Sequence, residues 1–239
     1  MVSSSTAIHM NTNKSFYTLL QIADSIFPIG SYTQSNGLET YVQKEIVKDV
    51  ISAEAYLKNI LLNNFLYNDF LGLKFAYEYA ESGNIEKIFH LDKLLYAVKA
   101  PREMKQGSSK MCIRFIKLVE NLKNDELLQQ YKNSIKDGIC KGQHSIAFGI
   151  FAVVSGIPME YAVKAYFYNT ASCIVNNCVK LIPLGQVDGQ IILFKCHKLL
   201  EDIYVKLDSL TIEDLGRCSI GFDIRAMQHE TLYSRLYMS

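Results

Sequence analysis

The chain has 239 residues, of which 49% are hydrophobic, so it is long and apolar enough to bury a sizeable core without a disulfide or metal to hold it. Its 25 Lys and Arg residues are balanced by 24 Asp and Glu residues, and the net charge of +1 argues against a nucleic-acid binder or a protein of anionic membrane surfaces. The six cysteines form no CxxC motif and no stretch has membrane-spanning length, so we expect a cytoplasmic protein whose thiols are mostly buried.

Apolar residues recur at steps of three and four along nearly the whole chain, which predicts helices. Residues 1–13 lack the basic start and apolar run of a signal peptide and are expected to form a flexible tail. The first helix contains Phe16 and is followed by a loop at 27–39. A helix of roughly thirty residues is then predicted from Ser52 to about Ser82, since it meets no proline on the way.

Capping residues, prolines and glycines divide the rest of the chain. The predicted helices are 84–98, 101–122, 125–137, 143–154, 158–183 and 186–207, followed by a loop at 211–221 and a last helix from Asp223 to the C-terminus. The helix after Pro158 is apolar around much of its circumference and is the candidate for the central helix. No linker or repeat divides the chain, so the sequence predicts a single all-α domain at 14–239, a bundle of about nine to ten helices.

Sequence motifs for common catalytic and metal chemistry are missing. The chain has no GxxxxGK[ST] or GxGxxG loop for phosphates, no GxSxG and no HExxH, and the near match HETLY at His229 lacks the second histidine. We therefore assign no catalytic, cofactor or metal residue. Two alternatives stay open: a helical enzyme that assembles its site from Asp24, Glu39 and His144, and a nickel carrier that uses scattered His and Cys residues. With only five histidines, the second is disfavoured.

Two segments contain more polar, aromatic and conformationally special residues than a simple connection or chain end requires. One is the loop FPIGSYTQSNGLE at 27–39, in which a proline and two glycines shape a long turn. The other is the C-terminal segment, which is rich in residue types found at interface centres. Each could serve only the fold or could contact a partner. The candidate partner-binding residues are Tyr32, Gln34, Ser35 and Glu39 in the loop, and Met227, His229, Tyr233, Arg235, Leu236 and Tyr237 at the end of the chain.

Several blocks of the sequence resemble the family of urease accessory proteins called UreF. LLQIADSIFPIGSYTQSNGLETYVQ is similar to the family's amino-terminal signature, and HSIAFGIFAVVSGI, NNCVKLIPLGQVDGQ and AMQHETLYSRLYMS are similar to its later blocks. The resemblance extends from about Phe16 to Ser239. It departs from the family pattern at Gln34, where most members have a histidine. A role that needs an imidazole at this position is therefore in doubt, although glutamine can still donate and accept hydrogen bonds.

The resemblance implies a non-catalytic scaffold of urease maturation. A UreF protein is expected to form a homodimer, to bind UreD (also called UreH), and to recruit and modulate the GTPase UreG. The assembly inserts nickel into apo-urease, so that nickel and GTP are handled by the partner proteins. The resemblance also assigns dimer contacts to Lys164 and Tyr168, which lie four residues apart and hence on one helix face.

Overall fold

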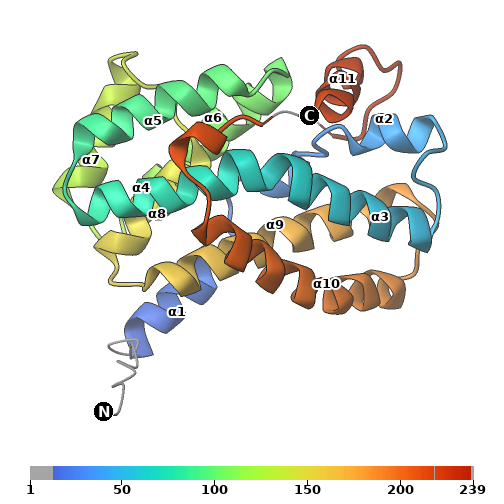
Figure 1. The fold of residues 1–239 in the computed structure, drawn as a ribbon, viewed down its shortest axis with the longest axis horizontal. Coiled ribbons are helices and arrows are strands. Elements are labelled where there is room, and N and C mark those ends of the chain that lie inside the picture. Colours follow the sequence, from blue (N-terminus) through green and yellow to red (C-terminus); the bar gives the residue numbers. More distant parts are fainter. Residues whose placement is uncertain (1–12, 218, 238–239) are drawn as a thin grey trace.

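Helices alone build the part of the chain described by the computed structural model, which comprises residues 13–217 and 219–237 without the side chains of Asn13 and Tyr32 (Figure 1). In these two ranges there is no β-strand. If α3, η2 and α4 are counted as the one continuous helix that they form, the described residues contain ten helical rods. The predicted all-α bundle is confirmed, while the predicted tail lies outside the described residues up to residue 12.

The helices follow one another along the chain with short connections. The α-helices are α1 (Asn13–Ile22), α2 (Leu38–Gln43), α3 (Val50–Ile60), α4 (Leu71–Glu81), α5 (Ile85–Val98), α6 (Arg102–Val119), α7 (Glu126–Lys136), α8 (His144–Val154), α9 (Met159–Leu181), α10 (Gln186–Asp208) and α11 (Ile220–His229). Two 3₁₀ turns, η1 (Ser31–Thr33) and η3 (Ile212–Asp214), and a π-helical segment, η2 (Leu61–Phe70), complete the described elements. Among them, none has the length and apolar content needed to cross a lipid bilayer.

The longest rod joins α3, η2 and α4 and confirms the predicted helix of about thirty residues. A reciprocal cap begins it: Asp49 Oδ1 accepts from the Ser52 amide at 2.8 Å, and Ser52 Oγ accepts from the Asp49 amide at 3.0 Å. The π winding of η2 was not predicted, because π-helices usually occur as single turns and share the apolar periodicity of α-helices. Asn64, Asn68 and Asp69 of η2 are buried, so this segment brings polar groups into the core.

The core lies where α4, α8 and α9 meet (Figure 1). Nine of the eleven residues of α8 are buried, and α8 approaches α4 so closely that a Cβ at Gly149 would lie 3.0 Å from the Leu73 carbonyl oxygen. The predicted central helix, α9, packs against α1, α2, α3, α4, α8 and α10. The prediction is confirmed in this sense, although α8 is the more completely buried helix.

A buried lysine fixes the end of α10 to α4. Lys74 Nζ donates to the backbone carbonyls of Leu207, Asp208 and Leu210 at 3.2, 3.0 and 3.1 Å. These carbonyls belong to the last turn of α10 and the residues after it, where backbone carbonyl groups have no N–H donor within the helix. The ammonium group therefore caps the helix and anchors it to the core at the same time.

The last helix is shorter than predicted and begins earlier. It was expected to run from Asp223 to the C-terminus, whereas α11 spans Ile220–His229. Beyond α11, the backbone amides of Leu236 and Tyr237 donate to the carboxylate of Glu39, at 2.6 and 3.2 Å. Those amides are consequently not available for helical hydrogen bonds, and the predicted helix is wrong beyond His229.

The close contact between α4 and α8 gives a first testable prediction. Gly149→Ala is expected to lower the free energy of unfolding by about 1–3 kcal/mol, since its Cβ meets backbone that cannot move aside. In Gly221→Ala, within α11, the Cβ meets nothing within 4 Å, and the change is expected to be neutral or to stabilise by up to about 1 kcal/mol. Urea denaturation of both variants measures the difference. Equal stability of the two variants would contradict the packing argument.

Candidate functional site

The loop at 27–39 is shaped by two glycines in the left-handed backbone region. Gly30 has φ 84° and Gly37 has φ 83°. Gly37 is also required by a close approach, because a Cβ there would lie 3.0 Å from the Cα atom of Ala226 in α11. A larger residue would push α11 away. The loop thus packs directly against α11.

Hydrogen bonds fix this loop to the core. Asn177 Nδ2 of α9 donates to the Gln34 carbonyl at 2.7 Å, and the guanidinium of Arg114 in α6 donates to the Ile29 carbonyl at 3.3 Å. The side chain of Gln34 lies over Gly107 of α6, where a Cβ would come within 2.5 Å of Gln34 Oε1. The loop is therefore attached to both α6 and α9.

A cluster of four ionisable residues joins the end of the loop to the C-terminal segment. We call it the terminal latch, and it consists of Glu39 in α2, Glu103 in α6, His229 in α11, and Arg235. His229 Nε2 lies 2.6 Å from Glu39 Oε2, and His229 Nδ1 lies 2.6 Å from Glu103 Oε2. Arg235 Nη1 donates to the other oxygen of Glu103 at 2.7 Å. The imidazole has no exposed surface. The side chains of Glu103 and Arg235 are 15% and 39% exposed, so water reaches the outer side of the latch.

The same carboxylate of Glu39 holds the backbone that follows α11. Its Oε1 accepts from the Leu236 amide and its Oε2 accepts from the Tyr237 amide, as described above. Gln43 Nε2 adds a hydrogen bond to the Ser234 carbonyl at 3.1 Å. The ring of Tyr237 is buried, and burial together with the Glu39 charge raises the pKa of Tyr237 to about 12. The C-terminal segment is thus docked on α2 by its main chain as well as by its side chains.

Docking leaves a set of apolar side chains facing solvent. We call it the terminal surface. Its members are Ile220, Ile224 and Met227 on one face of α11, and Tyr233 and Leu236 on the segment after it. Tyr233 is fully exposed, and Leu236 is 68% exposed although its backbone amide is buried against Glu39. Exposed aromatic and aliphatic side chains on a fixed backbone are typical of a protein-binding surface.

The predicted site residues divide into an interior group and an exterior group. Gln34, Ser35, Glu39, His229 and Tyr237 are buried, whereas Met227, Tyr233, Arg235 and Leu236 are exposed. The side chain of Tyr32 lies outside the described residues. The structure brings the C-terminal candidates and Glu39 together, and the contacts within the chain show that Glu39 and His229 hold the segment in place. Direct partner contact remains a prediction for the exposed ones.

Sequence reasoning missed Glu103, Ile220 and Ile224. Glu103 was one of several isolated acidic residues in the sequence, and it stands in the first turn of α6, where the helix dipole alone explains an acidic residue. Its partner His229 is 126 positions away in the chain, so no local spacing could reveal the pair. Ile220 was missed because the last helix was predicted to begin at Asp223. Ile224 lies within that predicted helix, but nothing in its type or spacing marked it as exposed.

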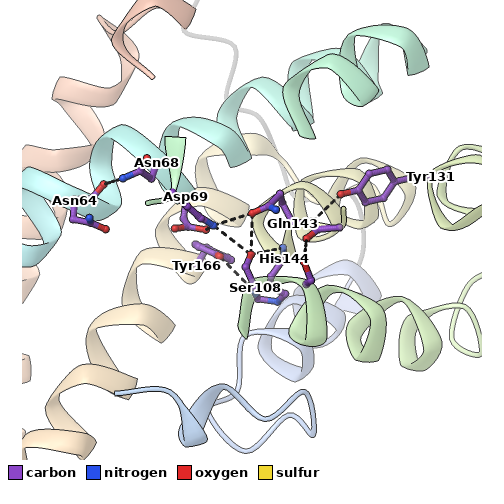
Figure 2. A network of polar contacts seen from close by, with 11 residues as sticks. Asn64, Asn68, Asp69, Ser108, Tyr131, Gln143, His144 and Tyr166 are labelled. Atoms are coloured by element: carbon purple, nitrogen blue, oxygen red, sulfur yellow. Dashed lines mark hydrogen bonds and ion pairs between the residues drawn. The ribbon is translucent and has the colours of Figure 1, made fainter. Parts of the chain in front are cut away.

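A second buried polar cluster lies on the inner side of the loop (Figure 2). It lines a cavity of about 70 Å³ between the loop, η2, α6, α8 and α9. Lys99 Nζ donates to Asp69 Oδ1 at 2.8 Å, to Gln143 Oε1 at 2.9 Å and to Ser108 Oγ at 3.3 Å. The buried ammonium group is thereby fully paired, as burial of a charge requires.

His144 lines the same cavity (Figure 2). Its Nδ1 lies 3.2 Å from Tyr166 Oη, while its Nε2 has no hydrogen-bond partner within the described residues. Burial lowers the pKa of His144 to about 4, against an opposing effect of the Asp69 carboxylate. The ring is therefore neutral near pH 7.

The alternative of an enzyme built from Asp24, Glu39 and His144 finds no geometric support. Asp24 is exposed after α1, where its carboxylate accepts from the Ile26 amide at 2.9 Å and braces the turn. Glu39 belongs to the terminal latch, and His144 lines the inner cavity. The structure thus places the three residues in three different settings, and each has a local structural role.

The alternative of a nickel carrier finds no preformed site either. Within residues 13–217 and 219–237, no group of three or more His, Cys, Asp and Glu side chains is arranged to hold a metal ion. The buried cysteines of these ranges are Cys112, Cys140, Cys178 and Cys196, and burial raises the pKa of each thiol. Four of the five cysteines among the described residues are thus buried, as the sequence predicted, and burial favours the protonated thiol.

Comparison with known proteins decides the family. The UreF family model matches residues 47–197. Urease accessory protein UreF of Haemophilus influenzae (strain PittEE) is 39% identical over 222 residues, which cover 92% of this chain and 94% of the relative. UreF proteins of Actinobacillus pleuropneumoniae serotype 5b (strain L20) and Bacillus sp. (strain TB-90) are 37% and 36% identical, over 92% and 93% of this chain and 97% and 98% of theirs. The chain belongs to the UreF family.

The region matched by the UreF model covers the helices from α3 into α10. Glu39 precedes this region and His229 follows it. The terminal latch therefore connects the two flanks of the matched bundle, at the place where the resemblance to the UreF signature and to its last block was noticed.

The two residues assigned to a UreF dimer lie on the edge of α9 that faces α10. Lys164 Nζ is paired with Glu160 at 3.0 Å and with Glu201 at 2.7 Å, and it lies over the ring of Tyr204. Tyr168 is 45% exposed and borders an open cavity of about 460 Å³ between α1 and α9. Lys164 is thus engaged within the chain, whereas the ring of Tyr168 is partly accessible.

The buried imidazole of the inner cavity predicts a pH dependence of stability. The folded-state pKa of His144 lies below the value of about 6.5 for a histidine in water, so the unfolded chain binds more protons between about pH 6.5 and pH 4. This residue is therefore expected to lower the free energy of unfolding as the pH falls through that window, by up to about 3 kcal/mol. His144→Phe, between Phe115 and Phe148, is expected to reduce this slope in urea titrations.

The control replaces an exposed histidine in α10. His197→Gln is expected to keep the native pH profile, because its side chain faces water. If His144→Phe and His197→Gln gave the same slope between pH 4 and 6.5, the buried ring could not be the cause.

Proposed function

We propose that this UreF protein is a non-catalytic scaffold of urease maturation in the cytoplasm. It binds UreD (UreH) and recruits and modulates the GTPase UreG, and the assembly inserts nickel into apo-urease. Membership of the family supports the maturation role, and the resemblance of the sequence blocks supplies the partners. In this proposal nickel and GTP are handled by the partner proteins, and the chain contributes shape and contact residues.

The observation that carries the proposal is the arrangement of the terminal surface on the terminal latch. A chain end is usually mobile unless it is tied down. Here Glu39 binds two consecutive backbone amides, of Leu236 and Tyr237, while the apolar side chain of Leu236 faces outward. Because the backbone is already ordered, a partner that contacts this surface loses less conformational entropy on binding.

The first test replaces exposed residues of the terminal surface. Tyr233→Asp and Leu236→Asp are each expected to weaken binding to UreD and UreG by about 30-fold or more, since a charge would enter the centre of the contact. Both side chains face solvent, so the melting temperature should stay near that of the native chain. Co-purification with UreD and UreG, followed by titration of the isolated partners, measures the loss.

A matched control is Ile139→Asp, which places the same charge at a residue 47% exposed in the loop after α7. It is expected to bind like the native chain. The proposal would be contradicted if both terminal variants still co-purified at native levels, or if the control lost binding equally.

We further propose that the chain forms a homodimer through the face that contains Tyr168. Tyr168→Asp is expected to convert the dimer into a monomer in light scattering after size exclusion, at an unchanged helical content, because the ring lies at the rim of the groove between α1 and α9. Ile139→Asp again serves as the control. A native chain that is monomeric at micromolar concentration, or a dimeric Tyr168→Asp variant, would refute this part.

A further inference from the structure

The two contacts of His229 in the terminal latch need one hydrogen more than a neutral imidazole and two ionised carboxylates can supply. Each nitrogen of His229 lies 2.6 Å from a carboxylate oxygen, one of Glu39 and one of Glu103, and each contact needs a hydrogen between its two atoms. A neutral imidazole carries one N–H group, and ionised carboxylates carry no hydrogen. The closed latch must therefore hold one extra proton. The count is the same whether this proton resides on the ring or on one of the carboxyl groups.

We propose that docking of the C-terminal segment is a proton-linked switch, closed while the latch keeps its extra proton and released when that proton leaves as the pH rises. Without this proton, a lone pair of His229 would face a carboxylate oxygen in a buried site, which is strongly unfavourable. Once the segment is released, the ring, Glu39 and Glu103 meet water. An imidazole in water is mostly neutral above about pH 6.5, so opening and loss of the proton favour each other.

Other charged groups near the His229 ring come from α2, α6, α11 and the segment that follows α11. Arg235 binds the outer oxygen of Glu103, and the amides of Leu236 and Tyr237 bind Glu39. Arg102, Lys110 and Glu230 line a polar cavity of about 320 Å³ together with Glu103 and Arg235. Asp223 and Arg225 of α11 lie near Tyr41 of α2. The two carboxylates are thus the groups that contact the ring directly.

The switch acts on the terminal surface, and this consequence rests on the proposed function. Closure orders the backbone that presents Tyr233 and Leu236, and opening lets it move. If these residues contact UreD and UreG, assembly is expected to weaken as the pH rises above neutrality. The switch itself is a property of the isolated chain and can be measured without any partner.

Amide hydrogen exchange of the full chain tests the switch directly. The amides of Leu236 and Tyr237 donate to Glu39 only when the latch is closed. Their protection factors, corrected for the intrinsic pH dependence of exchange and measured from pH 6 to pH 9, are expected to fall as the pH rises, with a limiting slope of tenfold per pH unit for one proton. Amides in the buried helix α8 are expected to keep their protection. Constant protection of Leu236 and Tyr237 across this range would overturn the proposal.

Two variants identify the proton. Glu103→Gln supplies a hydrogen from its amide, so that a neutral ring can donate to Glu39 and accept from position 103. It is expected to keep the two terminal amides protected at pH 8.5 and to flatten their profile. His229→Gln removes the ring and is expected to give lower and flat protection, while His197→Gln on the surface keeps the native profile.

A Glu103→Gln profile as steep as that of the native chain would overturn the proposal. Should His229→Gln fail to fold, the profiles of the native chain and of Glu103→Gln still decide. A chain that shows the pH-dependent release but never co-purifies with UreD or UreG would refute the proposed function and leave the switch standing.

Discussion

Two carboxylates and one imidazole hold the C-terminal segment against α2 and α6, with Glu39 and His229 buried and Glu103 partly exposed. Burial of these groups is tolerated only because each faces a partner of opposite character at hydrogen-bond distance. Removing one partner from such a cluster leaves a buried charge without compensation, which typically costs about 3–5 kcal/mol. The position of the segment is therefore close to all-or-none, with little room for intermediate arrangements.

The rest of the bundle brings the four latch residues together. Gly37 allows α11 to rest on the loop and begins α2, so that Glu39 points from its first turn. Pro101 begins α6 and places Glu103 in the first turn of that helix. The bundle from α3 to α10 fixes these two starts relative to each other, and α11 adds the imidazole. The region matched by the family model thus fixes the positions of the segments before and after it, and these two segments meet at the terminal latch.

Local rules predicted most of the fold. Asn84 and Asp125 cap the helices that were expected after them, because a short polar side chain satisfies free amides whatever the rest of the chain does. The same rules could not reveal the π winding of η2, which has the apolar pattern of an ordinary helix. They also overextended the last helix, since Glu39 competes for the amides of Leu236 and Tyr237 from almost 200 positions away in the sequence.

The segments that form the candidate site could be predicted from their residue composition, but the contacts between them could not. Residue types marked the loop and the chain end as unusual, and the family resemblance linked both to partner binding. Nothing local indicated that Glu39 and His229 would bind each other, or that Glu103 would complete the cluster. Such pairings depend on distant elements and become visible only when the chain is folded.

The sequence distance between Glu39 and His229 also orders events during synthesis. Residues are added from the N-terminus onward, and α2, α6 and the core helices leave the ribosome before the segment that carries His229 and Arg235. The bundle can collapse earlier, but its outward-facing Tyr233 and Leu236 gain a fixed position only once α11 and the segment after it have emerged. A nascent chain therefore lacks this ordered surface until its last residues have emerged.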